Sequence, residues 1–329
     1  MDSKIGIRIM ATGRYFPDKI LTNHDLEKMV ETSDAWITER TGIKQRRIAE
    51  SHQATSDLAT EAARIALKKA AISGEDLDGI IVATITPDMF FPSTACFVQK
   101  NLGAKKSFAF DLSAACSGFI YSLGVAAGLI RNEVARYILV IGAETLSRFT
   151  DWQDRNTCVL FGDAAGAMVL GPNYDDDSLL SLYLRADGSY HNLLYMPGGA
   201  SRNPATPQTV SSRLHYMKME GREVFKVAVT KMEEAAEKAL ELANLKSSDI
   251  ALLIPHQANM RIIEALIKRF GFPREKVAIN LDRYGNTSAA TIITALDEAI
   301  EQKRVKHGDK VLMAAFGGGF TWAGAVIKL

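Results

Sequence analysis

The sequence predicts an α/β protein built from two similar halves, and two observations lead to this prediction. Apolar runs of strand length alternate with helical patterns along the chain, which is typical of buried strands covered by helices. In addition, a single shift of 173 residues brings separate segments into phase, because it carries Ala62 onto Ala235 and Ile138 onto Val311. An old duplication explains this regularity better than chance does.

The individual elements follow from these patterns in chain order. We expect strands at 80–83, 108–111, 137–141, 167–170, 252–254 and 311–315. We expect helices at 61–71, 117–131, 232–244, 260–270 and 287–303. A long surface loop is expected at 196–208, where glycines and prolines are concentrated.

The two halves are predicted to span residues 1–172 and 173–329. Turn-forming residues and three consecutive acids interrupt the apolar pattern at 171–177, which favours a connection there. The repeat loses phase before Gly166, where the matching shift falls from 173 to 158. The first half should therefore hold about 15 extra residues at this point, in a segment that contains Trp152 and Arg155.

Composition and charge exclude several classes of protein. The chain has 329 residues, of which 47% are hydrophobic, so a large buried core is expected. Lys and Arg number 39 against 38 Asp and Glu, which is not the basic excess of a dedicated nucleic-acid binder. The three cysteines fit neither a disulfide framework nor a metal site. No signal peptide or membrane span is recognisable, so we expect a cytoplasmic protein that does not enter a membrane.

Cys116 lies between the strand at 108–111 and the helix at 117–131. At such a corner the sulfur is close to unpaired backbone N–H groups and to the positive end of the helix dipole. We therefore expect a thiol that ionises readily and acts as a nucleophile. A buried, unreactive cysteine is the alternative.

His256 and Asn286 are the other candidates. His256 follows a predicted strand, and ligands bind at strand ends in α/β sheets, so its imidazole is a candidate acid, base or hydrogen-bond donor; a core histidine is the alternative. Asn286 precedes a predicted helix, where capping is the alternative role. The shift of 173 places Asn286 on Ser113, close to Cys116. If the halves pack about a pseudo-twofold axis, the three candidates meet in one pocket.

Three consecutive glycines at 317–319 follow the strand at 311–315. Without side chains, their backbone can approach a ligand closely. One of their N–H groups could face a developing oxyanion together with the N–H of Cys116. A hairpin or bulge is the alternative.

Six motifs are distributed over essentially the whole chain. They are Ser-Asp-Ala-Trp-Ile-Thr-Glu-Arg-Thr-Gly-Ile at 33–43, Ser-Ala-Ala-Cys-Ser-Gly-Phe at 113–119, Phe-Gly-Asp-Ala-Ala-Gly-Ala at 161–167, Pro-His-Gln-Ala-Asn at 255–259, Gly-Asn-Thr-Ser-Ala-Ala at 285–290 and Phe-Gly-Gly-Gly-Phe-Thr-Trp at 316–322. Together they resemble the β-ketoacyl-acyl carrier protein synthase III family, the initiating condensing enzymes of type II fatty acid synthesis. The resemblance implies a thiolase fold, in which duplicated α/β halves form a five-layered αβαβα core, and it implies a homodimer.

The resemblance also implies a catalytic triad of Cys116, His256 and Asn286. Cys116 would take an acyl group from acyl-coenzyme A, and loss of carbon dioxide from malonyl-acyl carrier protein would give an enolate that attacks the acyl-cysteine. Neutral His256 and Asn286 would donate hydrogen bonds to the malonyl thioester oxygen. The N–H groups of Cys116 and Gly318 would hold the oxyanion during acyl transfer. No metal or cofactor is implied, because the coenzyme A thioester is a substrate.

Three more residues gain binding roles from the resemblance. Trp36 and Arg155 would hold the adenine of coenzyme A, with Arg40 near its phosphates. From the residues alone, Trp36 would be assigned to the core and Arg155 to the surface. Phe91 would reach across the dimer interface and bound the acyl pocket.

Basic residues near the helix at 260–270 are implied to dock the acidic carrier protein. Arg261 matches a docking arginine of the family, and the further candidates are Lys268, Lys226 and Arg269. A near-neutral chain would meet an acidic partner through such a local patch. A solvated helix face is the alternative.

Three alternatives share some of these features. A papain-like protease shares the order Cys, His, Asn, but its flanking motif is absent. A secondary-metabolite condensing enzyme or acyltransferase of the same subfamily stays open. A non-catalytic scaffold would need none of Cys116, His256 and Asn286.

Overall fold

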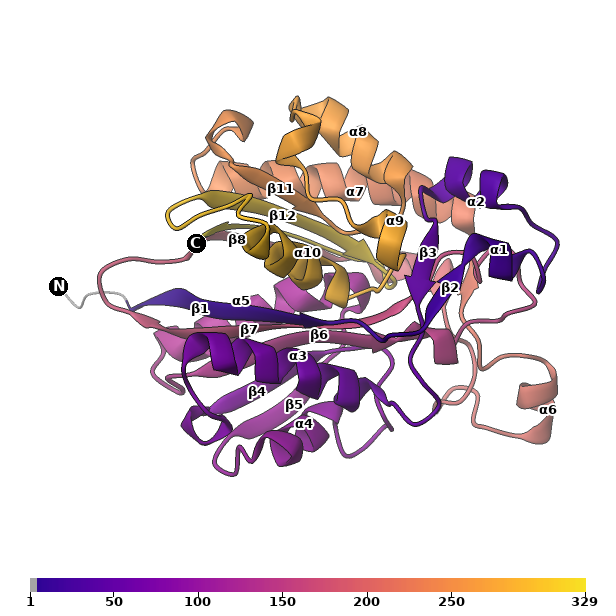
Figure 1. Cartoon of the computed structure of the whole chain (residues 1–329), viewed down its shortest axis with the longest axis horizontal. Coiled ribbons are helices and arrows are strands. Elements are labelled where there is room, and N and C mark those ends of the chain that lie inside the picture. The colour runs from indigo at the N-terminus through magenta and orange to yellow at the C-terminus, as the bar shows by residue number, and fades with distance from the viewer. Residues whose placement is uncertain (1–4) are drawn as a thin grey trace.

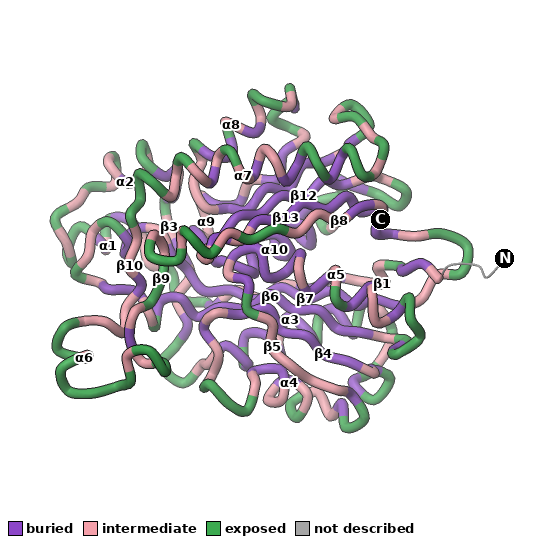
Figure 2. Tube along the Cα trace, turned by 180° about the vertical axis from the view of Figure 1, so that it is seen from behind, coloured by how far each residue is buried: buried purple, intermediate pink, exposed green. Residues whose placement is uncertain are grey.

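Two mixed β-sheets lie face to face with a pair of helices between them and further helices on each outer side (Figure 1). The computed structural model describes residues 5–329. The order of the layers is helix, sheet, helix, sheet, helix, so the five-layered αβαβα thiolase fold is confirmed. In Figure 2 the buried colour follows the two sheets and the helix between them, which shows where the core lies.

The first sheet has the strand order β1-β7-β6-β4-β5. Its strands are β1 Gly6–Tyr15, β4 Gly79–Ala83, β5 Phe108–Leu112, β6 Ile138–Thr145 and β7 Asp163–Asn173. β4 pairs in parallel with both β5 and β6, whereas β7 pairs antiparallel with β6 and β1. The predicted strands β4 and β6 lie in the centre of this sheet and are buried along their whole length.

The second sheet repeats this pattern with one strand fewer. Its strands are β8 Leu179–Ala186, β11 Leu252–Pro255, β12 Lys310–Gly317 and β13 Thr321–Lys328. Their order, β8-β13-β12-β11, has the same sequence of antiparallel, antiparallel and parallel pairings as β1-β7-β6-β4. In the place of a fifth strand there is only an isolated bridge between Leu253 and Val277. The placement of the boundary between the halves at 172/173 stays a prediction.

The connection between the last two strands differs between the halves. Residues 146–162 connect β6 to β7, whereas residues 318–320 connect β12 to β13. The extra segment therefore lies where the loss of phase in the repeat predicts it. It carries Trp152 and Arg155 to the end of the molecule where the parallel strands terminate.

The long helices form the other three layers. They are α3 Thr55–Ala70 and α4 Thr94–Leu102 outside the first sheet, α5 Gly118–Arg131 and α10 Ala290–Glu301 between the sheets, and α7 Gly221–Leu242 and α8 Met260–Phe270 outside the second. α8 has the predicted bounds. α3 begins earlier than predicted because its first turn, Thr-Ser-Asp, is polar and hides the apolar periodicity. α7 also begins earlier, because β-branched residues in its first turns resemble a strand as much as a helix.

Short elements decorate the ends of the strands. They are β2 Ile20–Thr22, α1 Asn23–Leu26, α2 Asp34–Thr41, β3 Gln45–Arg47, β9 Leu194–Tyr195, α6 Pro207–Ser211, β10 Lys218–Met219 and α9 Leu281–Tyr284. α6 ends the exposed segment that was predicted as a surface loop at 196–208, and Figure 1 shows it extending from the body of the protein. Within residues 5–329 no helix is long and apolar enough to span a membrane.

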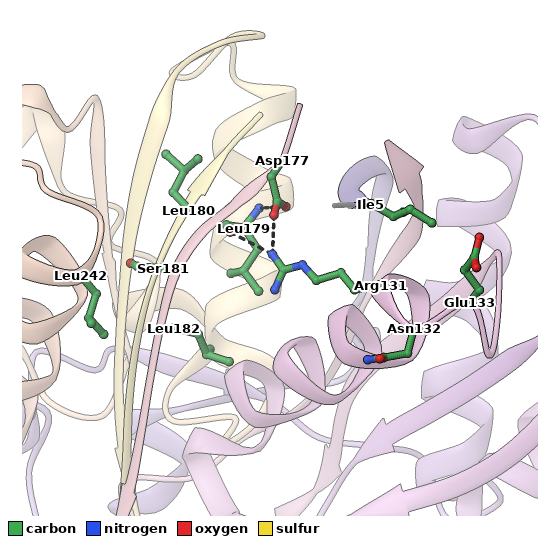
Figure 3. Close-up of a pocket in the computed structure, with 10 residues that line it drawn as sticks. All are labelled: Ile5, Arg131, Asn132, Glu133, Asp177, Leu179, Leu180, Ser181, Leu182 and Leu242. Atoms are coloured by element: carbon green, nitrogen blue, oxygen red, sulfur yellow. Dashed lines mark hydrogen bonds and ion pairs between the residues drawn. The ribbon is translucent and has the colours of Figure 1, made fainter. Parts of the chain in front are cut away.

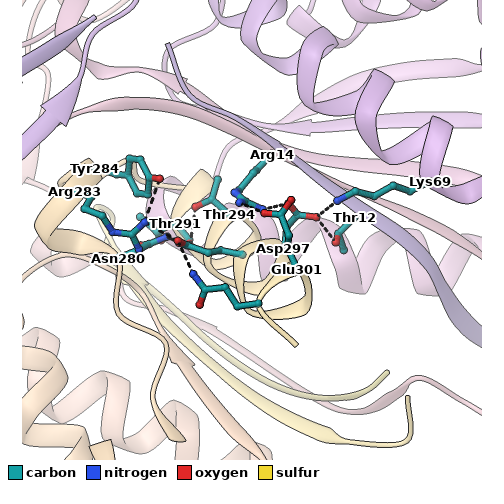
Figure 4. A network of polar contacts seen from close by, with 12 residues as sticks. Thr12, Arg14, Lys69, Asn280, Arg283, Tyr284, Thr291, Thr294, Asp297 and Glu301 are labelled. Carbon is teal, nitrogen blue, oxygen red and sulfur yellow. Dashed lines mark hydrogen bonds and ion pairs between the residues drawn. The ribbon is translucent and has the colours of Figure 1, made fainter. Parts of the chain in front are cut away.

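A buried carboxylate ties the central helix α10 to the first half (Figure 4). Asp297 is 1% exposed and accepts hydrogen bonds from Thr12 Oγ1 at 2.7 Å, Arg14 Nη1 at 2.5 Å and Lys69 Nζ at 2.8 Å. These donors come from β1, the edge strand of the first sheet, and from α3, the helix that packs against that strand. All three donors belong to the first half, whereas Asp297 belongs to the second. These hydrogen bonds therefore help to fix how the two halves pack.

A surface hollow of about 910 Å³ lies beside the start of β8 (Figure 3). It is bordered by the last residue of α5, Arg131, which pairs with Asp177 at 2.5 Å. Cys116 lies just before the first residue of the same helix. A helix rises about 1.5 Å per residue, so the hollow and Cys116 are separated by about 20 Å. This hollow is therefore distinct from the cavity that holds Cys116.

Candidate active site

Cys116 lies in a tight turn that connects strand β5 to helix α5. β5 ends at Leu112, residues Ala115–Ser117 form a 3₁₀ turn, and α5 follows directly. Ala115 has a φ of 47°, in the left-handed region, so the chain turns sharply just before the cysteine. Two hydrogen bonds to β13 hold the corner in place, from Thr321 Oγ1 to the Ala114 carbonyl (2.8 Å) and from Ser117 Oγ to the Thr321 carbonyl (3.2 Å).

Cys116 lines a cavity of about 370 Å³ and is 7% exposed. Apolar side chains make up much of the wall; they are Ile85, Leu146, Phe149, Phe161, Leu194, Met196 and Met217. Ser113, Ser288 and Gly318 lie on the same wall. An apolar chamber with a few polar groups around one sulfur suits an acyl chain whose reactive end meets the thiol.

The glycine run packs against the cysteine, as the oxyanion prediction requires. A Cβ on Gly317 would lie 2.5 Å from the backbone N of Cys116, so only glycine permits this approach. Gly318 follows it and faces the same cavity as Cys116. The glycine run also forms the hairpin connection from β12 to β13. The two predicted roles, close approach to a ligand and a hairpin turn, therefore fall on the same residues.

Asn286 is held between α9 and α10 with its side-chain orientation defined. Its backbone N donates to the Leu160 carbonyl (2.9 Å) and its carbonyl accepts from Gly162 N (3.0 Å). Its Oδ1 accepts from the N–H of Ser288 at 2.8 Å. Because Oδ1 is used in this way, the amide NH₂ of Asn286 is left as a donor for a ligand.

His256 follows β11, and its backbone N donates to the Ala314 carbonyl of β12 at 2.8 Å. The ring is 2% exposed, and its Nδ1 lies 2.7 Å from the hydroxyl of Thr291 on α10. Burial lowers the pKa of His256 to about 3. The imidazole is therefore neutral at pH 7 and cannot hold an extra proton, but it can donate one N–H.

The three candidates meet at the start of α10. Asn286 is bonded to Ser288 and His256 to Thr291, and Thr291 Oγ1 is 3.0 Å from the Ser288 carbonyl. Ser288 itself lines the cavity of Cys116, whereas His256 and Asn286 are buried behind that wall. The structure thus brings together the segments that the duplication predicted to meet.

The thiol of Cys116 does not ionise readily, contrary to the expectation from the helix dipole. Burial raises the pKa of Cys116 to about 12, and the nearby carboxylate of Glu144 adds to the rise. The pattern of a strand followed by a helix shows the dipole, but it does not show how completely the sulfur is removed from water. The nucleophile must therefore lose its proton during the reaction.

Glu144 is a buried residue that sequence reasoning missed. It is the penultimate residue of β6, is 0% exposed, and accepts hydrogen bonds from Thr86 Oγ1 (2.6 Å), Thr84 Oγ1 (3.1 Å) and Ile85 N (3.1 Å). Burial raises the pKa of this carboxyl to about 7 despite those bonds. A lone acid near the end of an apolar strand is the signal by which the sequence could have revealed it.

Trp36, Arg155 and Arg40 lie together on the surface. The guanidinium of Arg155 is 4.7 Å from the centre of the Trp36 ring, and that of Arg40 is 5.7 Å from it. Trp36 is half-buried on α2 and is therefore neither core nor fully exposed. One aromatic face flanked by two cations is suited to a planar base that carries phosphates.

The basic candidates lie on and beside α8. Arg261 and Lys268 are exposed, and among residues 5–329 no carboxylate pairs with either. Lys226 pairs with Glu223 at 2.8 Å and Arg269 with Glu237 at 3.6 Å, which reduces their net charge toward a partner. Asn259, which caps α8, donates to the Arg40 carbonyl at 3.0 Å, so α8 begins beside the Trp36 cluster.

Phe91 is 84% exposed in the segment between β4 and α4 and does not line the cavity of its own chain. Over the described range, 5–329, no group of three or more His, Cys, Asp or Glu side chains is arranged to hold a metal ion. The observed chemistry is thus that of one buried thiol, two neutral hydrogen-bond donors and a backbone glycine run.

Comparison with known proteins agrees with this chemistry. The family model described as 3-Oxoacyl-[acyl-carrier-protein (ACP)] synthase III matches residues 110–188, and the model of its C-terminal part matches residues 240–329. A β-ketoacyl-[acyl-carrier-protein] synthase III of Caldanaerobacter subterraneus is 58% identical over 100% of this chain and 99% of its own. The one of Natranaerobius thermophilus is 57% identical over 98% of each chain.

Solved structures give the same result. The crystal structure of 3-oxoacyl-[acyl-carrier-protein] synthase III from Aquifex aeolicus is 50% identical, with a TM-score of 0.91 over 98% of this chain and 100% of that one. The priming β-ketosynthase of the R1128 polyketide pathway is 33% identical, with a TM-score of 0.93 over 100% of this chain and 98% of that one.

The duplicated fold and the buried cysteine define a condensing enzyme of the thiolase type. Such an enzyme is an acyltransferase that forms a carbon–carbon bond between two acyl groups. More particularly, the chain belongs to the β-ketoacyl-[acyl-carrier-protein] synthase III family. Members of this family carry out the initiating condensation of fatty acid synthesis.

Proposed function

We propose that Cys116 accepts an acyl group from acyl-coenzyme A and passes it to the carbanion formed from malonyl-acyl carrier protein. The observation that supports this most is the shared cavity of Cys116, Ser288 and Gly318. Asn286 is bonded to Ser288, and His256 is bonded to Thr291, three residues further along the chain. No metal or cofactor takes part in the proposed reaction. Acyl-coenzyme A is a metabolite of the cytoplasm, where we place the protein.

In the first half-reaction the sulfur of Cys116 attacks the thioester carbonyl. The carbonyl oxygen becomes an oxyanion, which the N–H groups of Cys116 and Gly318 stabilise. The C–S bond to coenzyme A then breaks and leaves an acyl-cysteine. The apolar wall around the sulfur accommodates the acyl chain while coenzyme A leaves.

In the second half-reaction the malonyl group loses carbon dioxide. The electron pair of the broken C–C bond moves onto the thioester as an enolate, so what the step needs is hydrogen-bond donors at the thioester oxygen rather than a base. The neutral imidazole of His256 and the free NH₂ of Asn286 are two such donors. The enolate carbon then attacks the acyl-cysteine, and Cys116 leaves as a thiolate that takes up a proton.

Both substrates enter from the same side in this proposal. Trp36 and Arg155 hold the adenine of coenzyme A, and Arg40 contacts its phosphates. The carrier protein docks on α8 through Arg261 and Lys268, with Lys226 and Arg269 in support. The bond from Asn259 to the Arg40 carbonyl makes the two binding surfaces neighbours, so each pantetheine arm reaches Cys116 from the same direction.

The proposal includes a homodimer. β5 is an edge strand, and its residues Phe108, Phe110 and Leu112 are only half-buried in the single chain. Phe91 is almost fully exposed nearby, which is costly for a large apolar side chain unless a partner covers it. Sedimentation equilibrium should give about twice the chain mass of 36.0 kDa. A mass of one chain at micromolar concentration would contradict the dimer.

The reaction is tested by mass spectrometry of the product. The protein is incubated with a panel of acyl-coenzyme A primers and malonyl-acyl carrier protein, and we expect a β-ketoacyl carrier product of mass set by the primer. An acyl-cysteine that malonyl-acyl carrier protein does not discharge would instead indicate an acyltransferase.

A priming β-ketosynthase of secondary metabolism is the second candidate, favoured by the similarity to the R1128 enzyme. The two candidates use the same chemistry but different carrier proteins. Competition between a carrier protein of fatty acid synthesis and one of polyketide synthesis distinguishes them, because the preferred carrier should be extended faster at equal concentration.

A further inference from the structure

Arg46 on β3 is a buried cation whose hydrogen bonds all go to uncharged groups. It is 0% exposed, and within the described residues 5–329 no carboxylate forms an ion pair with it. Its Nε is also buried and makes no hydrogen bond to any described residue. Burial lowers the pKa of Arg46 to about 10, so the side chain stays charged at pH 7. A buried charge without a counter-ion costs free energy, so stability alone does not explain an arginine at this position.

The guanidinium of Arg46 joins two segments that are far apart in the chain. Its Nη1 donates to the side-chain Oδ1 of Asn23 at 2.9 Å and to the Leu21 carbonyl at 3.2 Å. Its Nη2 donates to the Val159 carbonyl at 2.8 Å. Because the donors of a guanidinium lie in one plane and point in fixed directions, these bonds set the spacing between residues 21–23 and residue 159.

The segment that follows Val159 holds the backbone of Asn286. The Leu160 carbonyl accepts from Asn286 N at 2.9 Å, and Gly162 N donates to the Asn286 carbonyl at 3.0 Å. The stem of Arg46 packs against the same place, because a Cβ on Gly162 would lie 3.0 Å from the Arg46 Cβ. Arg46 therefore supports the two strands of chain between which Asn286 is held.

Asn23 extends the contacts of Arg46 to the helix α2. Asn23 is 1% exposed, and its Nδ2 donates to Asp34 Oδ1 at 2.9 Å and to the Ile43 carbonyl at 2.7 Å. Asp34 is the first residue of α2, and Ile43 lies two residues after its last. Asn23 thus anchors both ends of the helix that carries Trp36 and Arg40.

The same bonds connect the two sides of the contact between Trp36 and Arg155. Residues 154–158 form a turn that carries Arg155, and Val159 follows this turn directly. The guanidinium of Arg155 is 4.7 Å from the centre of the Trp36 ring. Arg46 bonds to the segment of Arg155 on one side and, through Asn23, to the helix of Trp36 on the other.

We propose that Arg46 is a positioning residue that sets Trp36 against Arg155 and, through the same guanidinium, fixes the backbone of Asn286. It contacts no substrate, because it is fully buried, and no proton or group is transferred to it. One buried side chain thereby determines the geometry of the coenzyme A surface and of an enolate donor. This inference rests on the proposed function and adds to it a residue through which the two sites share a support.

The positioning itself is tested without any ligand, by hydrogen–deuterium exchange and peptide mass. Arg46→Met keeps an unbranched side chain but removes the guanidinium, and it should stay folded because the buried charge is removed with it. Exchange in peptides that cover 157–163 and 284–290 should become about 10-fold faster, which corresponds to the loss of one hydrogen bond. Peptides from β4 and β6 should exchange as in the unaltered protein. Thermal unfolding checks the fold.

Binding and activity should divide in a way that a loss of stability does not produce. In Arg46→Met the Kd for coenzyme A, measured by titration calorimetry, should rise about 10-fold. Carbon dioxide release from malonyl-acyl carrier protein by the acyl-enzyme should slow about 10-fold, because Asn286 is displaced. Acylation of Cys116 by an acyl-pantetheine thioester, which lacks the nucleotide of coenzyme A, should not change.

Two further variants separate the contacts of Arg46. Asn23→Ala removes the connection to α2 but keeps the bond to Val159, so the Kd for coenzyme A should rise while exchange at 284–290 stays unchanged. Arg47→Met is the matched control on the same strand. The Nη1 of Arg47 donates to the carbonyls of Pro17 and Asp18, both at 3.1 Å, and to neither segment that Arg46 joins. Exchange, Kd and both half-reactions should stay as in the unaltered protein.

Three results would overturn the inference. Unchanged exchange at 284–290 in a folded Arg46→Met would mean that Arg46 does not hold Asn286. Faster exchange in all peptides alike would assign Arg46 to global stability. An unchanged Kd for coenzyme A in Asn23→Ala would do the same for the Trp36 surface, even if Arg46→Met fails to fold. If the unaltered protein binds no coenzyme A, the proposed function itself fails, and the exchange experiment still decides whether Arg46 positions Asn286.

Discussion

The Nδ1 atom of His256 lies 2.7 Å from the hydroxyl oxygen of Thr291. That hydroxyl donates its proton to the Ser288 carbonyl 3.0 Å away. It therefore joins the imidazole ring to the turn that carries Ser288 and Asn286. Thr291 thereby fixes the orientation of the His256 ring beside Asn286.

Thr291→Val removes this hydroxyl and keeps the side-chain shape. We expect malonyl decarboxylation to slow about 10-fold, the equivalent of one hydrogen bond of about 1.4 kcal/mol, because the imidazole ring is no longer held in its orientation. Release of carbon dioxide measures the rate. Thr291→Ser, which keeps the hydroxyl, should restore it; a Val variant as fast as the unaltered protein would show that Thr291 does not orient the ring.

His256→Ala and Asn286→Ala each remove one donor to the enolate. Decarboxylation should fall by a factor of about 10² to 10³, as for the loss of one oxyanion donor, while acylation of Cys116 changes far less. The two half-reactions are measured separately, by carbon dioxide release and by the mass of the acyl-enzyme. Equal losses in both would contradict the role as enolate donors.

Arg261→Glu reverses the charge of an exposed residue that no carboxylate pairs with in the described part of the chain. The KM for malonyl-acyl carrier protein should rise about 10-fold, because a charge at the rim of an interface acts mainly on association, whereas the KM for acyl-coenzyme A should not change. Lys68→Glu on α3, outside the other sheet, is the control of equal charge change. A similar rise in both variants would assign the effect to net charge.

Gly317→Ala would place a Cβ 2.5 Å from the Cys116 backbone N. The corner that holds the cysteine must then move, so acylation should fall by about 100-fold or more, because small displacements of reacting groups have effects of this size. Gly128→Ala in α5 meets no atom within 4 Å and should stabilise its helix by about 0.5–1 kcal/mol. A fully active Gly317→Ala would show that the close approach is not needed.

Asp297 makes stability depend on pH. Burial alone would raise its pKa, but hydrogen bonds from Lys69, Thr12 and Arg14 hold the pKa below the ordinary value of 3.8. A lowered pKa in the folded protein means that the carboxylate stabilises the fold above pH 3.8 and that this contribution is lost as the pH falls below it. Asp297→Ala should cost about 3 kcal/mol at pH 7 in urea unfolding. The difference should shrink toward pH 3; a constant difference would contradict the ionic role.

Most central strands and α8 could be predicted from the sequence because their apolar patterns are unambiguous. β6 is buried along its whole length, and α8 alternates apolar and charged residues at helical spacing. β13 was missed although it is buried, because Gly324 and two alanines interrupt its large apolar side chains. β1 and β8 were missed because each has one partly exposed face and contains polar residues. Their equivalence is visible only once the two strand orders are compared.

For the candidate active site, the sequence predicted which residues take part but not their protonation states. Cys116, His256 and Asn286 each follow or precede a regular element, which made them recognisable. The neutral state of Cys116 and the raised pKa of Glu144 depend on burial by segments far away in the chain, so no local pattern reveals them. Glu144 was overlooked because a single acid at a strand end resembles the start of a surface loop.

The account depends most on the claim that Cys116 carries the acyl group. Peptide mass mapping after brief incubation with an acyl-coenzyme A tests it directly, because the chain has only two other cysteines, Cys96 and Cys158. We predict an acyl mass on the peptide that contains Cys116 and none in a folded Cys116→Ala variant. An acyl group on another residue, or an acylated Cys116→Ala, would contradict the account.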